Sequence, residues 1–163
     1  MAELKQRGMK WLRLFHILTA GIWFGGVVCI GILAYICFFQ LTENEFLTVI
    51  PLVPALYQKI LPFALLTVAQ GFIYGFFTKW GFIKHKWVLC KWILTFFIVL
   101  LTGLGGIGQI HTVIVKVETF GFEGGFADGG LALLFIFLQI TLMAVMIALS
   151  VFKPRIGKPS PDS

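Results

Sequence analysis

The chain has 163 residues, of which 59% are hydrophobic and only 12% are charged. A soluble domain is nearer half apolar and about one quarter charged, and one this short could not bury so much apolar surface in a single core. The composition therefore excludes an ordinary soluble domain and predicts that lipid is the solvent. The three cysteines, Cys29, Cys37 and Cys90, have no CxxC or metal-ligand spacing and are interpreted as small packing residues.

Four long apolar stretches predict an all-α integral membrane four-helix bundle in a single transmembrane domain. A helix needs about 20 residues to cross roughly 30 Å of hydrocarbon. The second stretch is the shortest, and Pro62 is interpreted as a first-turn proline that marks its start. The expected spans are residues 14–39, 61–80, 87–110 and 131–152, followed by a cytoplasmic tail at 153–163.

The first and last of the three connections are expected to differ in character. Residues 40–60 contain Pro51, Pro54 and an apolar set, so we expect a short amphipathic segment that lies in the membrane interface. Residues 112–130 are rich in glycine, and we expect a mobile loop there.

Basic residues gather at one end of the predicted bundle. Eleven of the 13 Lys and Arg residues lie before the first span, in or beside the connection between the second and third spans, or in the tail. Five of the seven acidic residues lie in the other two connections. Cytoplasmic loops carry the excess of Lys and Arg, so the sequence predicts an N-in/C-in orientation. The net charge of +6 is then explained by the basic residues at the cytoplasmic end, and no nucleic acid is expected as a partner.

Glycine pairs indicate how the helices pack. Gly21 with Gly25 on the first span, and Gly71 with Gly75 on the second, have GxxxG spacing. Small residues at this spacing let backbones approach closely in lipid, so either face could form a homodimer. Four further glycines crowd the third span, where close packing is favoured over a ligand-facing groove. They are Gly103, Gly105, Gly106 and Gly108.

Polar side chains within the spans are candidates for function, because they are costly in hydrocarbon. His16 lies about one turn beyond Arg13 on the first span, and Lys91 lies at a similar depth on the third. Tyr74 on the second span lies in the same half of the bundle, together with Gln70.

The histidines admit alternatives. A neutral imidazole is a common ligand of heme iron, so His16 is either a heme ligand or is hydrogen-bonded to a neighbouring helix. His111, at the outer end of the third span, is either a ligand at an outer site or an interfacial polar residue. The two levels are about 30 Å apart, so His16 and His111 cannot ligate one iron. His85, between two lysines, is expected to be solvated, and Met143 and Met146 are more simply core residues.

Two short motifs carry a family resemblance over residues 10–95. The first span reads Lys10-Trp-Leu-Arg-Leu-Phe-His16 and then Ile22-Trp23-Phe24-Gly25-Gly26, and the third begins Trp87-Val-Leu-Cys-Lys91. This pattern resembles a group of small bacterial integral membrane proteins, the HemJ-type protoporphyrinogen oxidases and the CopD-domain proteins of copper resistance.

The resemblance implies a b-type heme in the bundle, with His16 as a ligand and Trp87 and Lys91 as the matching tryptophan–lysine pair. It also implies a bacterial inner (cytoplasmic) membrane and an electron-transfer or oxidoreductase role with an unknown redox partner. The arginine that usually follows the tryptophan motif in HemJ proteins is absent here, so the reaction is left open. Transport of copper or a porphyrin, and a non-catalytic membrane assembly subunit, are the alternatives.

Overall fold

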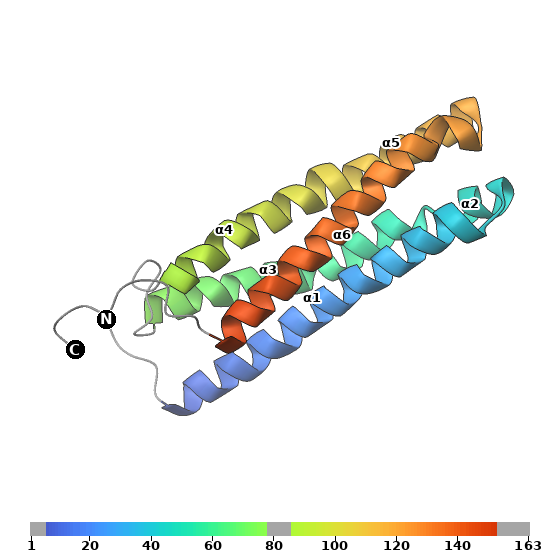
Figure 1. Cartoon of the computed structure of the whole chain (residues 1–163). Coiled ribbons are helices and arrows are strands. Elements are labelled where there is room, and N and C mark those ends of the chain that lie inside the picture. The colour runs from blue at the N-terminus through green and yellow to red at the C-terminus, as the bar shows by residue number, and fades with distance from the viewer. Residues whose placement is uncertain (1–5, 78–85, 153–163) are drawn as a thin grey trace.

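The chain folds into an all-helical bundle of four long antiparallel rods (Figure 1). The computed structural model describes residues 6–77 and 86–152. Within these ranges four helical stretches are long and apolar enough to cross a membrane, as the sequence predicts. The elements are α1 (Gln6–Gln40), α2 (Glu43–Val49), α3 (Leu52–Phe77), α4 (Lys86–Leu100), η1 (Leu101–Ile107), α5 (Gly108–Phe120) and α6 (Phe122–Phe152).

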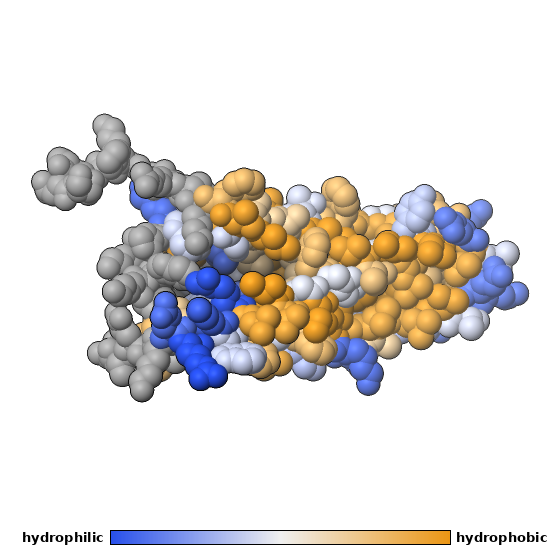
Figure 2. Space-filling model, turned by 90° about the horizontal axis from the view of Figure 1, so that it is seen from below, coloured by the Kyte–Doolittle hydropathy of each residue, from blue (hydrophilic) through white to orange (hydrophobic). Residues whose placement is uncertain are grey.

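The two ends of the bundle are polar and its middle is apolar. Figure 2 shows a broad hydrophobic band between hydrophilic ends. We call the end at which α1 starts and α6 finishes the terminal end, and the opposite one the α2 end (Figure 1). The predicted tail at 153–163, and residues 78–80 of the predicted second span, lie outside the described residues.

The rods are longer than a bilayer requires. α1 has 35 residues, which at a rise of 1.5 Å each amounts to about 52 Å, against roughly 30 Å of hydrocarbon. The hydrophobic core of the bundle extends into the α2 end. Phe46 is fully buried there, and its ring centroid lies 5.3 Å from that of Phe38 on α1 and 5.3 Å from that of Phe122 on α6.

The segment that was expected in the membrane interface buries one of its faces in the bundle. Phe46, Ile50 and Val53 are fully buried, because residues spaced three and four apart share one helix face. α3 begins at Leu52, well before the predicted start at residue 61, so Pro62 lies inside the helix and not in its first turn. The prediction of a first-turn proline was wrong, whereas the position of residues 40–60 at a membrane interface stays a prediction.

The glycine-rich stretch 112–130 is also helical and is not a loop. The third rod continues through α5 to Phe120, and α6 begins at Phe122. Only Gly121 interrupts the hairpin, with a φ of 78° that a residue without a Cβ adopts at little cost. The spans predicted to end at residue 110 and to begin at residue 131 are therefore longer than expected.

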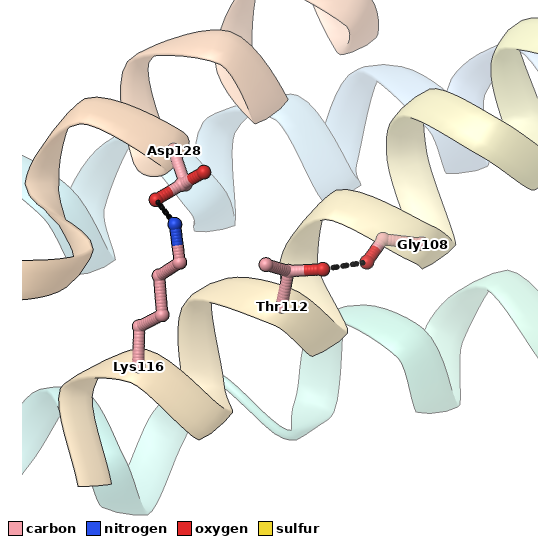
Figure 3. Close-up of polar contacts among 4 residues, drawn as sticks. All are labelled: Gly108, Thr112, Lys116 and Asp128. Carbon is pink, nitrogen blue, oxygen red and sulfur yellow. Dashed lines mark hydrogen bonds and ion pairs between the residues drawn. The ribbon is translucent and has the colours of Figure 1, made fainter. Parts of the chain in front are cut away.

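Side-chain contacts, as well as the turn, stabilise the hairpin formed by α5 and α6. Lys116 Nζ on α5 lies 2.6 Å from Asp128 Oδ2 on α6 (Figure 3). One turn away on the same face of α5, the Thr112 hydroxyl donates to the carbonyl oxygen of Gly108 at 3.1 Å (Figure 3). The first contact joins the two helices, and the second satisfies a hydroxyl within α5 itself.

Two glycines of α6 are packing positions rather than helix breakers. A Cβ on Gly125 would lie 2.5 Å from Cγ2 of Val117 on α5, and a Cβ on Gly129 would collide with the ring of Phe38 on α1. Gly125 and Gly129 have GxxxG spacing, which permits close helix approach. Their presence explains why a glycine-rich segment is ordered as helix.

The third rod contains a π-helical turn, η1, in the middle of its length. A π-helical turn widens the helix locally and is commonly found at functional sites. Gly106 is buried in η1, and a Cβ there would lie 2.6 Å from the hydroxyl of Tyr57. Close packing, which the sequence favoured for these glycines, is confirmed at Gly106.

Candidate functional site

His16 faces the interior of the bundle. It lies on the same face of α1 as Thr19, Trp23 and Val27, which are buried, because positions three and four apart on a helix share a face. The imidazole is half-buried near the terminal end. His16 is thus placed where a polar side chain can meet the neighbouring helices.

The ring of His16 meets α3 directly. Its centroid lies 5.5 Å from that of Tyr74, and the two rings are edge to face at 81°. The Nδ1 atom is buried and has no hydrogen-bond partner within residues 6–77 and 86–152. A buried polar atom normally has such a partner, so an unpaired Nδ1 indicates an interaction that the described side chains do not supply.

An amide from α3 adjoins the imidazole. Gln70 interacts with the side chain of His16, and its Oε1 lies 3.1 Å from the hydroxyl of Thr19 on α1. The neighbouring helix thus places an amide beside His16, but Nδ1 has no hydrogen-bond partner among the described residues.

Two cations and the predicted aromatic residues complete the cluster. Lys91 on α4 is close enough to His16 to act on it electrostatically, and its Nζ lies 6.0 Å from the ring centroid of Trp87, one helical turn away. Arg13 interacts with the phenol of Tyr74. We call His16, Tyr74, Gln70, Lys91 and Arg13 the terminal cluster.

His111 is not part of this cluster. It lies on α5, where it is exposed, and α5 continues for nine residues beyond it. The prediction that His111 ends the third helix was therefore wrong. It lies on the same rod as Lys91, about 20 residues further along the chain.

The remaining candidate side chains either pack in the bundle or lie outside the described residues. Met143 is buried, and the sulfur of Met146 lies 3.6 Å from the hydroxyl of Thr95. His85 lies outside the described residues. Over the described ranges, no three His, Cys, Asp or Glu side chains lie close enough together to hold a metal ion.

One buried polar network was not predicted from the sequence. Tyr57 Oη donates to Oε1 of Gln139 at 3.1 Å, and Nε2 of Gln139 donates to the hydroxyl of Thr102 at 2.8 Å. These contacts join α3, α6 and η1. Gln139 was detectable in principle as a lone amide within the fourth apolar stretch, whereas Tyr57 lay in a segment that was not expected to be in the bundle.

A groove lies between α1 and α3, nearer the α2 end than the terminal cluster. None of the predicted site residues lines it. Its lining is apolar apart from one ammonium group and one thiol, and consists of Ile22, Gly26, Cys29, Leu56, Lys59 and Ile60.

No family model, no curated protein sequence and no solved structure matches this chain. The resemblance to the HemJ-type and CopD-domain proteins therefore stays a prediction. The protein is classified by its fold and its polar residues. It is an all-helical protein with four helices that can span a membrane and a histidine-centred polar cluster near the terminal end.

Proposed function

We propose that this protein binds one b-type heme at His16 and takes part in electron transfer or a related oxidoreduction at the cytoplasmic side of a bacterial inner membrane. The observation that carries the proposal is the buried Nδ1 of His16, which has no hydrogen-bond partner in the described part of the chain. An imidazole that faces the interior and is not fully used by protein contacts is available to a ligand.

The rest of the terminal cluster suits the other groups of a heme. The heme propionates are carboxylates, and they are held by cationic side chains through charge-assisted hydrogen bonds. Lys91 and Arg13 lie within the cluster and supply two such cations. Trp87 and Tyr74 add aromatic surface beside them, which suits a flat macrocycle.

The orientation follows from the charges at the two ends. The terminal end carries Arg7, Lys10 and Lys86, whereas the α2 end carries Glu43 and Glu118. The positive-inside rule assigns the terminal end to the cytoplasm, which puts the terminal cluster within reach of a cytoplasmic redox partner. Fusion of a reporter that is active only in the cytoplasm to the C-terminus tests the orientation.

The heme proposal is tested by the absorption spectrum of the full chain, purified in detergent from heme-sufficient cells. We expect a Soret band that His16→Ala abolishes and His111→Ala retains. The second variant is the matched control, because His111 is an exposed histidine outside the cluster. Circular dichroism and size-exclusion chromatography establish that each variant is folded.

Two outcomes contradict the proposal. The protein would not be a heme protein if it were colourless and showed no Soret band after addition of hemin. The ligand would be misassigned if folded His16→Ala bound heme like the parent.

A second candidate function is that of a non-catalytic assembly subunit, and one observation favours it. A Cβ on Gly21 or on Gly25 would meet nothing within 4 Å, whereas one on Gly71 would contact Trp92 at 3.7 Å. Of the two predicted homodimer faces, the one on α1 is therefore uncovered and the one on α3 is in part occupied. Stable co-purification with a second membrane protein, with no cofactor in this chain, would favour this candidate.

A further inference from the structure

Lys59 has an unusual position for a cation. It lies on α3 next to Ile60, whose side chain packs on Gly26 so closely that a Cβ there would lie 2.6 Å from Ile60 Cγ2. Gly26 is 13 residues from Arg13, which corresponds to about 20 Å along α1. Lys59 thus lies within a helical stretch that can span a membrane and not, as expected from the sequence, in the connection at residues 40–60.

The direction of Lys59 follows from the direction of its helix. The Cα–Cβ bonds of an α-helix tilt toward the N-terminus of that helix, and α3 starts at the α2 end. Lysine side chains within a membrane reach for the nearer interface and keep their apolar stems in the hydrocarbon. Both effects direct the ammonium group of Lys59 toward the membrane surface at the α2 end.

No carboxylate of the described residues forms an ion pair with this ammonium group. The ion pair between Lys116 and Asp128 is the one salt bridge among residues 6–77 and 86–152, and Lys59 is exposed. It lies at the edge of the groove between α1 and α3, whose other walls include the apolar side chains of Ile22, Leu56 and Ile60. A cation above an apolar groove is complementary to a molecule with an anionic head and a hydrocarbon chain.

We infer that this groove binds an anionic phospholipid of the leaflet at the α2 end. One acyl chain lies along Ile22, Gly26 and Cys29, and the headgroup phosphate pairs with Lys59. Ile60 packs onto Gly26 and forms the floor of the groove there, and the lipid supplies the negative charge that the described residues do not. The inference is independent of the proposed heme site, which involves none of these residues.

The test is native mass spectrometry of the full chain released from nanodiscs of equal parts phosphatidylglycerol and phosphatidylcholine. We expect retained lipid enriched in phosphatidylglycerol, and we expect Lys59→Gln to lower that enrichment about fivefold, the effect of one lysine at a membrane surface. Lys116→Gln is the comparison variant, since it removes a charge of the same sign that already pairs with Asp128, and its enrichment should equal that of the parent. Cys29→Phe fills the groove without a change of charge and should reduce retention of both lipids.

Three results would overturn the inference. They are an unchanged enrichment in Lys59→Gln, equal retention of the two lipids by the parent, and a disulfide between two copies through Cys29 with no retained lipid. The third would identify a second copy of the chain as the occupant of the groove.

Discussion

The hydroxyl of Tyr57 on α3 donates a 3.1 Å hydrogen bond to Oε1 of Gln139 on α6, and both side chains are buried in the bundle. The same amide donates to Thr102 of η1 at 2.8 Å, so Gln139 joins three helical segments. Neither water nor lipid can replace these partners, because the site is enclosed by the helices. The network therefore specifies how α3, α6 and the π-helical turn fit together.

Replacement of Gln139 by leucine should destabilise the bundle, because it leaves the buried hydroxyl of Tyr57 without its acceptor. It also removes a bond to Thr102, whose hydroxyl keeps its bond to the carbonyl oxygen of Ile98. We expect a loss of about 1 to 2 kcal/mol, in line with hydrogen bonds between membrane helices and the cost of unpaired buried groups. Thermal or denaturant unfolding in detergent measures the loss. Gln58→Leu, at an exposed position of α3, is the matched control and should cost little.

A double-mutant cycle with Tyr57→Phe separates the hydrogen bond from the loss of packing. We expect a coupling energy of roughly 0.6 to 1.7 kcal/mol between the two positions. Strictly additive effects would mean that the contact contributes nothing to stability.

Two glycines of the same π-helical turn should respond oppositely to alanine. A Cβ on Gly106 would lie 2.6 Å from Tyr57 Oη and 2.8 Å from Cζ, whereas one on Gly103 would meet nothing within 4 Å. Gly106→Ala should therefore cost about 1 to 3 kcal/mol by overpacking. Gly103→Ala should be neutral or stabilising by up to about 1 kcal/mol, because alanine loses less backbone entropy. Equal effects of the two substitutions on the unfolding midpoint would contradict this assignment.

The four spans were predictable because their apolar runs are long, but the helix ends were not. Glycine has two roles, as a breaker of helices and as a site of close approach, and its sequence neighbours do not distinguish them. Gly125 is helical because Val117 packs against it, and Gly129 because Phe38 does. Val117 lies on the other helix of the hairpin and Phe38 lies on α1, so neither partner is adjacent in sequence, and the glycine-rich stretch was interpreted as a loop.

The terminal cluster was more predictable than the network around Gln139. Depth along a span is a simple count of residues, which indicated that His16, Lys91 and Tyr74 lie at one level, and the structure brings them together. Tyr57 was missed because the start of α3 was set too late, and a residue expected in a connection was not considered as a partner for Gln139.

Lys91→Gln should weaken heme binding without abolishing it, if the proposed function holds. A charge-assisted hydrogen bond contributes about 1.5 to 3 kcal/mol, so we expect the hemin dissociation constant to rise roughly tenfold or more. Titration of the purified protein with hemin, followed at the Soret band, measures the change. Lys86→Gln removes the same charge from an exposed position at the start of α4 and should bind like the parent.

Asp128→Asn should have only a small effect on stability, although its ion pair with Lys116 is short. The two side chains are 22% and 41% exposed, and ion pairs in contact with water contribute at most about 1 kcal/mol. Added salt screens such charges, so the difference in unfolding midpoint between variant and parent should shrink as ionic strength rises. Glu123→Gln, an exposed neighbour in the same hairpin, is the matched control. A loss of several kcal/mol that salt did not reduce would instead mean that this hairpin is shielded from water in the native membrane assembly.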